Sequence, residues 1–416
     1  MKRALALILA LALAFAMAGC AGGASPAAQT PSSNAAAQTQ APAAPAAAEP
    51  ISIVVWESEG GPDQWLQQAA AKYKESHPNV TVEYKHVELG DTSTQIALDG
   101  PAGVGADLFA VPHDKIGELV TNGHVLAVDL KADVLEGCLK AATYDGKVYG
   151  YPQSTETYAL FYNKDLCPEP PKTWEELISF GKEFNAANPG KYAFVIDPGN
   201  GYYEVLFASA KGNTLFGPSG TDTANTYLNT ADALVGVKIF SSLKSEILPV
   251  AAADLATSTV DGLFQGGQVA MHITGPWNFK NFKDAGINFG VTTLPALPGE
   301  STPALSFSGT RLLCVSAYTD HPAEVSEFAE FLLSSEIQSL RYDITGALPS
   351  VSVQLGGEYG EYATGLLGQM DYAYPMPSIP QMGKFWDSAN SAFANIWDGA
   401  DPQAEMDSLN TVIISE

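Results

Sequence analysis

The segment from Thr143 to Leu177 constrains the fold most, because it predicts two strands in line rather than a hairpin. Lys147–Pro152 is a short, aromatic-rich run, and Tyr158–Tyr162 is an apolar run long enough for a buried strand. The residues between them, QSTET, include no Gly, Asn-Gly or Asp-Gly that would reverse the chain. We therefore expect the backbone to continue extended through this polar bridge and to cross from one lobe to another.

A new β/α unit is predicted after this crossing. Pro168, Pro170 and Pro171 end the sheet, since proline cannot donate a ladder hydrogen bond. The four residues TWEE, beginning at Thr173, have the spacing of a capping box, which starts a helix.

Strands and helices alternate along the rest of the chain, which predicts an α/β fold with open sheets. The part after residue 50 is longer than a single hydrophobic core usually supports, so two domains are expected. Strands are predicted at Ile51–Trp56, Val80–Tyr84, Asp107–Val111, Tyr192–Ile196 and Val269–Thr274. Helices are predicted at Pro62–Glu75, Lys115–Asn122, Ser179–Asn188, Val205–Lys211, Thr230–Ser242, Pro322–Tyr342 and Gln403–Ile414.

The N-terminus has the pattern of an export signal. Met1–Arg3 is basic and Ala4–Ala18 is apolar, but the apolar run is shorter than the roughly 20 residues that span a bilayer. Residues 1–19 are therefore predicted to be a secretory signal peptide. The Ala-Gly-Cys sequence that follows resembles a bacterial lipobox, which implies lipidation of Cys20. The alternative is ordinary cleavage nearby, with Cys20 incidental.

Residues 20–50 are predicted to be a lipid-anchored flexible linker. They are rich in Ala, Pro, Gln, Ser and Thr and carry one charge, Glu49, so they cannot bury enough apolar surface to fold. We expect the protein to be exported and held by its lipid at the outer face of the cytoplasmic membrane, on a Gram-positive-like cell surface.

Charge and cysteine content exclude some classes of partner. The formal net charge is −25, and no basic patch is available to neutralise phosphates, so nucleic acid is not an expected partner. Apart from Cys20 the chain has Cys138, Cys167 and Cys314, without C-x-x-C spacing. Three cysteines cannot all pair within one chain, and small buried side chains are predicted.

Several motifs occur in one order: DLFAVPHDKIGELVTNG from Asp107, the Thr143–Leu177 segment, TGPWNFKNF from Thr274, NFGVTTLPALPG from Asn288 and SIPQMGKFW from Ser378. From Ile51 to the C-terminus the chain closely resembles the maltodextrin-binding branch of the extracellular solute-binding proteins that serve ABC importers. The resemblance implies a two-lobed periplasmic-binding-protein type II fold with open mixed sheets, flanking helices and a ligand cleft between the lobes. It implies an N-terminal lobe of 51–154 plus 310–355 and a C-terminal lobe of 157–306 plus 356–416.

Three aromatic residues are candidate sugar platforms. Taken singly, Trp277 and Trp386 are more typical of core packing, because tryptophan is highly buried on average. The resemblance implies instead that both stack on glucose rings, with Tyr202 similarly placed. Trp and Tyr provide flat apolar area with few rotatable bonds, so little entropy is lost on binding.

The candidate polar contacts depart in part from the family pattern. The resemblance implies that the Glu156 carboxylate bonds sugar hydroxyls, and that Asp114 and Lys115 replace an Asp-Arg pair, although lysine lacks the guanidinium fork. A solvated linker glutamate and a helix N-terminal aspartate are the alternatives for Glu156 and Asp114. Ser58, Gly60 and Gly61 replace a family Asn, Asp and Lys, so Ser58 and Glu59 are the candidate contacts there, and Asn200 replaces a family Glu. These differences among the polar contact residues indicate an α-glucan, or another oligosaccharide, of altered length or linkage.

A surface glycoside hydrolase is the main alternative class. It needs two carboxylates across the scissile bond, one with a raised pKa, and nothing in the sequence singles out such a pair. We therefore predict no enzyme activity and no catalytic residue, cofactor or metal. A surface lipoprotein for adhesion or signalling is a third interpretation, since a fold does not fix a function. The preferred interpretation is a monomeric binding protein that captures an oligosaccharide by lobe closure and delivers it to ABC permease subunits.

Overall fold

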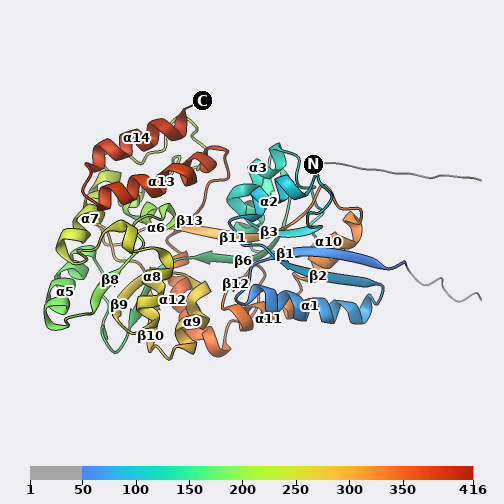
Figure 1. The fold of residues 1–416 in the computed structure, drawn as a ribbon, viewed down its shortest axis with the longest axis horizontal. Helices are drawn as coiled ribbons and strands as arrows, with labels where there is room; N and C mark the ends of the chain where they lie inside the picture. Colours follow the sequence, from blue (N-terminus) through green and yellow to red (C-terminus); the bar gives the residue numbers. More distant parts are fainter. Residues whose placement is uncertain (1–48, 416) are drawn as a thin grey trace, which may run out of the picture. The chain divides into compact units, whose positions relative to one another are not determined.

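The computed structural model describes residues 49–415. The predicted signal peptide, the lipidated Cys20 and nearly all of the 20–50 linker lie outside the described residues. The described part contains three sheets: one of seven strands, one of four and a two-stranded hairpin of β4 (Thr143–Tyr144) and β5 (Lys147–Val148). Strands of the two larger sheets are labelled in Figure 1. Within residues 49–415 no helix is both long and apolar enough to cross a membrane.

The seven-stranded sheet is mixed, with the order β12-β6-β11-β3-β1-β2 and β13 paired to β11. Strand β1 runs parallel to β2 and β3, whereas β11 runs antiparallel to β3 and β6. Its strands are β1 (Ile51–Glu57), β2 (Val80–His86), β3 (Leu108–Pro112), β6 (Tyr151–Thr157), β11 (Ser306–Val315), β12 (Leu348–Pro349) and β13 (Ala373–Pro375).

The apolar runs of β1 and β3 are explained by burial on both faces of this sheet. Successive side chains point to opposite faces of a strand. Leu108 and Ala110 accordingly join a cluster with α1 (Pro62–Ser76), α10 (Pro322–Phe331) and α11 (Ser335–Thr345). Phe109 and Val111 join a second cluster with α2 (Thr92–Asp99) and α3 (Ile116–Thr121).

The four-stranded sheet has the order β10-β7-β9-β8 and holds the largest apolar cluster. Its strands are β7 (Ala159–Asn163), β8 (Tyr192–Val195), β9 (Val269–Thr274) and β10 (Phe289–Thr292). Helices that pack in this cluster include α5 (Trp174–Ala187), α7 (Ala233–Glu246), α8 (Thr257–Gln265), α9 (Phe279–Asp284), α12 (Gly360–Met370), α13 (Gln381–Trp397) and α14 (Pro402–Ile414).

The prediction that the chain continues extended from one sheet into the other is confirmed, because β6 and β7 belong to different sheets and only Tyr158 separates them. The predicted bounds of the first strand are wrong: Lys147–Val148 forms the hairpin strand β5, and the polar residues 153–157, predicted as a bridge, lie within β6. The helix predicted after the prolines begins as expected. Thr173 Oγ1 accepts a hydrogen bond from Glu176 N at 3.1 Å, while Glu176 Oε2 accepts from Lys172 N at 2.8 Å. The lobe boundaries stay a prediction.

Two helix predictions are wrong in detail. Pro322–Tyr342 is not one helix: α10 ends at Phe331 and α11 begins at Ser335. Ser334 takes an extended backbone with ψ 145°, and the Gln338 side chain donates to Leu332 O at 3.1 Å, replacing a helical hydrogen bond. The segment Val205–Gly212 is a 3-10 helix with a break at Ala210 and Lys211, preceded by the short helix α6 (Gly201–Glu204).

The remaining short elements are α4 (Glu136–Ala141) and the 3-10 turns η1 (His113–Lys115), η3 (Ala252–Asp254), η4 (Pro276–Asn278) and η5 (Gly357–Tyr359). The three cysteines outside the N-terminal segment, Cys138, Cys167 and Cys314, are buried and free, as predicted.

Glu204 gives the core a specific pH dependence. Its side chain is fully buried, and burial, followed by the nearby charge of Asp197, raises its pKa well above the ordinary 4.5. The folded protein therefore keeps a proton that the unfolded chain releases above pH 4.5, so unfolding releases a proton and stability falls as pH rises. The slope from one such group is at most about 1.4 kcal/mol per pH unit.

We expect Glu204→Gln, which cannot ionise, to lose less stability than the parent protein between pH 5 and 8. Urea titrations at a series of pH values measure the difference. Glu183→Gln, at an exposed glutamate on α5, is the control and should follow the parent curve. Parallel curves for the parent and Glu204→Gln would show that Glu204 ionises freely in the folded state.

Candidate binding cleft

Two neighbouring cavities share the side chain of Glu156. The first, called here the aromatic cavity, has a volume of about 330 Å³ and is lined by Gly90, Pro112, Asp114, Lys115, Glu156, Tyr202, Met376 and Trp386. The second, called the polar cavity, has a volume of about 300 Å³ and is lined by Ser58, Glu59, Gly60, Pro62, Glu88, Glu156, Pro276, Trp277, Lys280, Asn281, Arg311, Arg341, Thr345 and Ala347. Together they contain every predicted site residue of the described chain except Asn200.

Glu156 is held on a strand at the junction of the two cavities. It lies on β6 opposite Gly309 of β11, and a Cβ at Gly309 would lie 3.2 Å from the Glu156 Cγ. Glycine at that position therefore leaves room for the carboxylate. Burial raises the pKa of the Glu156 carboxyl, and the Arg341 charge opposes this shift.

The aromatic cavity is organised by a hydrogen bond between residues far apart in the chain. Trp386, on α13, donates from Nε1 to Oδ2 of Asp114 at 2.9 Å. Asp114 lies in η1, directly after β3, and is buried. The bond fixes the indole ring while the ring itself still lines the cavity, so a flat apolar surface and a carboxylate lie side by side.

Tyr202 and Trp277 place further aromatic surface around Glu156. The Tyr202 ring packs edge-on against Tyr158 at a centroid distance of 5.0 Å and lies 6.2 Å from the Trp277 ring. The Tyr202 hydroxyl is buried and has no hydrogen-bond partner among residues 49–415. A Cβ at Gly275 would lie 2.2 Å from the Trp277 ring, so the indole rests directly on that glycine.

Arg311, which lines the polar cavity, forms a buried ion pair with Glu57 that could not be predicted from the sequence. Arg311 Nε donates to Glu57 Oε2 at 3.2 Å, and Arg311 Nη2 donates to the other carboxylate oxygen. Nη2 also donates to Ser58 Oγ at 2.6 Å. Ser58, a predicted ligand contact, is thus oriented by Arg311, while Glu59 beside it is exposed at the cavity edge.

Asn200 lines neither cavity. Its side chain caps α6 by accepting a hydrogen bond from Tyr202 N at 3.2 Å, and its amide lies 3.4 Å from Thr257 Oγ1. Asparagine is one of the residues preferred at a helix N-cap, so the sequence is also consistent with this structural role. The geometry gives Asn200 a supporting role for Tyr202, and ligand contact by Asn200 stays a prediction.

Other residues of the two cavities were missed by sequence reasoning: Met376, Lys280, Asn281, Arg311 and Arg341. Met376 follows a short strand in a proline-rich loop, and Arg341 lies within an amphipathic helix. Neither position carries a local sequence signal for ligand contact.

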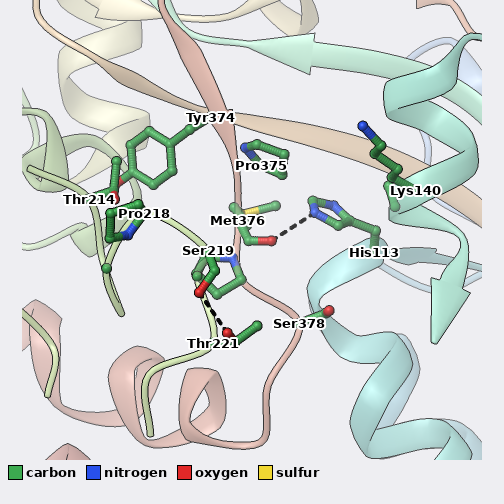
Figure 2. A pocket seen from close by; sticks show the side chains of 14 residues that line it. His113, Lys140, Thr214, Pro218, Ser219, Thr221, Tyr374, Pro375, Met376 and Ser378 are labelled. Carbon is green, nitrogen blue, oxygen red and sulfur yellow. Dashed lines mark hydrogen bonds between the residues drawn. The ribbon is translucent and has the colours of Figure 1, made fainter. Parts of the chain in front are cut away.

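A third cavity, of about 190 Å³, lies beside His113 and contains none of the predicted site residues. Figure 2 shows the His113 ring directed at the carbonyl oxygen of Met376, 3.0 Å from Nε2. His113 Nδ1 accepts from Thr310 N at 3.2 Å, so Nε2 carries the proton and donates to Met376. Burial lowers the pKa of His113 and favours this neutral ring. The same methionine lines the aromatic cavity, so His113 anchors one of its walls.

The arrangement suits a neutral polyhydroxylated ligand. Carboxylates and arginines supply fixed acceptors and donors for hydroxyls, and the indole and phenol rings supply flat surface for C–H faces. Within residues 49–415 no group of three or more His, Cys, Asp or Glu side chains is arranged to hold a metal ion. The α/β fold with two large sheets, together with this cleft, defines a binding protein for a small solute.

The family comparison agrees with that class. A family model described as bacterial extracellular solute-binding protein matches residues 68–364. The chain belongs to this family of solute-binding proteins, which serve ABC importers and are not enzymes. Family membership thus confirms the predicted class and the expectation that the chain has no enzyme activity.

Individual relatives extend over most of the chain. The galactooligosaccharide-binding protein of Bacillus subtilis is 30% identical over 370 residues, which are 85% of this chain and 87% of the relative. The maltooligosaccharide ABC transporter solute-binding lipoprotein of Streptococcus pneumoniae serotype 4 is 30% identical over 363 residues, 84% of this chain and 85% of the relative.

Solved structures confirm the two-lobed α/β fold. The crystal structure of a cyclo/maltodextrin-binding protein with maltotetraose has a TM-score of 0.75 at 33% identity, covering 88% of this chain and 97% of the other. The Thermus thermophilus maltotriose-binding protein bound with maltotriose has a TM-score of 0.78 at 25% identity, covering 87% and 99%.

Proposed function

We propose that this protein is the oligosaccharide-binding component of a carbohydrate ABC importer, with maltodextrin-type α-glucans as its ligands. The observation that carries the proposal is the cleft itself, in which Trp386, Tyr202 and Trp277 surround the carboxylate of Glu156. The printed names of several relatives and structural neighbours support the α-glucan assignment.

Capture follows from contacts that lie on both sides of the cleft. The sugar rings stack on the aromatic residues while Glu156, Asp114, Lys115, Ser58 and Glu59 bond hydroxyls. A ligand that contacts both proposed lobes, 51–154 plus 310–355 and 157–306 plus 356–416, favours the closed arrangement by its differential affinity. The closed form then delivers the ligand to permease subunits in the membrane.

Membrane attachment through a lipidated Cys20 completes the proposal. A relative named as a lipoprotein supports it, as does the small-residue sequence before the cysteine. In this arrangement the protein acts as a monomer at the outer face of the cytoplasmic membrane. Mass spectrometry of the N-terminal peptide of the exported protein tests the lipid step, since an unmodified Cys20 would contradict it.

Galactooligosaccharides are the second candidate ligand, because one 30% identical relative is named for them. Calorimetric titration with maltose, maltotriose, maltotetraose, a cyclodextrin and a β-1,4-galactotriose separates the two. We expect one-to-one binding of at least one α-glucan, because the aromatic surfaces fit stacked glucose rings. Binding of the galactotriose alone would identify galactooligosaccharides as the ligands. Binding of none of these sugars would contradict a carbohydrate ligand.

A further inference from the structure

Arg341 is a buried cation without a hydrogen bond that would explain its place in the fold. Its side chain lies on α11 and is 3% exposed, and it lines the polar cavity. Its Nε and Nη1 atoms are buried and have no hydrogen-bond partner among residues 49–415. Burying a charge without partners is costly, and an apolar side chain of similar size would pack there at lower cost.

Neighbouring side chains hold the Arg341 guanidinium in place but do not accept hydrogen bonds from it. Arg341 stacks over the Trp65 ring at 5.3 Å, and Trp65 is itself fixed by a 3.0 Å hydrogen bond from Nε1 to Ile337 O. Cation–π contact offsets part of the desolvation but supplies no acceptor oxygen. Burial lowers the pKa of Arg341 to about 10, so the group remains a cation at neutral pH.

Glu156 is the acidic neighbour of Arg341, but the two do not form a direct bond. Each shifts the pKa of the other towards its charged form, and both line the polar cavity. Among the described contacts there is neither a hydrogen bond nor an ion pair between them, in contrast to the two-point contact of Arg311 with Glu57. A donor and an acceptor therefore line the same cavity without being bonded to each other.

We propose that Arg341 is a ligand-binding residue that acts with Glu156 on two neighbouring hydroxyl groups of one sugar ring. Arg341 donates to one hydroxyl oxygen, and the adjacent hydroxyl donates to the Glu156 carboxylate. This inference rests on the proposed function and specifies which side chains bind hydroxyl groups of the ligand. The ring is that of a neutral hexose rather than a uronic acid. Of the three cations that line the cavity, Arg311 is already paired with Glu57 and Lys280 with Asp284. Arg341 has Glu156 as its acidic neighbour, and this carboxylate, with Glu59 and Glu88 in the same lining, opposes a ligand carboxylate.

Calorimetric titration of the full chain with maltotriose and with β-1,4-galactotriose tests the proposal. We expect Arg341→Met to weaken binding of the preferred trisaccharide about 10- to 100-fold, the range typical of a lost hydrogen bond to a charged group. Lys283→Met is the control: it removes a partly exposed cation of α9 that is paired with Glu358 and lines neither cavity, so less than about threefold change is expected.

Deoxy analogues distinguish ligand contact from a structural role. For the parent protein, one monodeoxy trisaccharide should bind about 10-fold more weakly, and with Arg341→Met the same analogue should lose almost nothing further. If Arg341→Met does not fold, Arg341→Lys takes its place, because lysine keeps the charge but lacks the paired donors of the guanidinium. The deoxy analogue should then lose less affinity with Arg341→Lys than with the parent protein.

The outcomes separate the two proposals. Parent-like affinity of Arg341→Met overturns the role of Arg341 and leaves the proposed function standing. An equal penalty for the deoxy analogue in parent and variant also overturns it, and so does tighter binding of a glucuronic-acid trisaccharide than of its neutral counterpart. A parent protein that binds none of maltose, maltotriose, maltotetraose, a cyclodextrin and β-1,4-galactotriose overturns both this inference and the proposed function.

Discussion

We expect Glu57→Ala to lower the free energy of unfolding by about 3–5 kcal/mol, the range for breaking a buried ion pair by removing one partner. Glu57 is 1% exposed and Arg311 is 8% exposed, and the two are joined at both carboxylate oxygens. The substitution leaves the guanidinium without its counter-charge where water cannot replace it. Urea titration followed by circular dichroism measures the loss.

Two further variants identify the cause. Glu83→Ala, which removes an exposed acid from neighbouring strand β2, should change stability by no more than about 0.5 kcal/mol. The double variant Glu57→Met/Arg311→Met should regain most of the loss, because both charges are gone and apolar side chains fill their space. A double variant as unstable as Glu57→Ala would assign the loss to packing rather than to charge.

We expect Trp277→Ala to weaken binding of the preferred oligosaccharide about 10- to 100-fold, or about 1.4–2.8 kcal/mol, and to leave the thermal midpoint of the ligand-free protein nearly unchanged. The indole is 38% exposed and lines the polar cavity, so its removal opens no hole in a closed core. Calorimetry for binding and differential scanning calorimetry for stability give the two values.

Tyr318→Ala is the matched control, because Tyr318 is also 38% exposed but lines neither cavity of the cleft. It should bind the ligand as tightly as the parent. A large drop in the ligand-free midpoint of Trp277→Ala, with little change in affinity, would instead show that Trp277 is a packing residue.

The fold was predictable where local pattern and tertiary environment agree. Strand β9 occupies the predicted Val269–Thr274 because all of its residues are buried, which a continuous apolar run indicates. The break between α10 and α11 was missed because the amphipathic pattern continues across it. Its stabilising contact, from the Gln338 side chain to a carbonyl, exists only in the folded chain.

The residues of the site likewise include some that could be predicted from the sequence and some that could not. Residues in motifs next to strand ends, such as Asp114 and Trp277, could be proposed from sequence and resemblance and do lie in the cleft. Arg341 could not, because an arginine on an amphipathic helix is ordinarily solvated. Only the packing of α11 against α1 buries it beside Glu156.

Glu156 is carried by β6, an interior strand paired with β11 on one side and β12 on the other. The hydrogen bonds to both neighbouring strands order its backbone when the protein folds. Little further backbone entropy is therefore lost at this position when a ligand binds. The same rigidity means that the carboxylate cannot follow a ligand whose hydroxyls are differently spaced. Changes of specificity in this protein and its descendants should therefore arise around Glu156, in the turns that carry Trp277 and Asp114, rather than by movement of Glu156 itself.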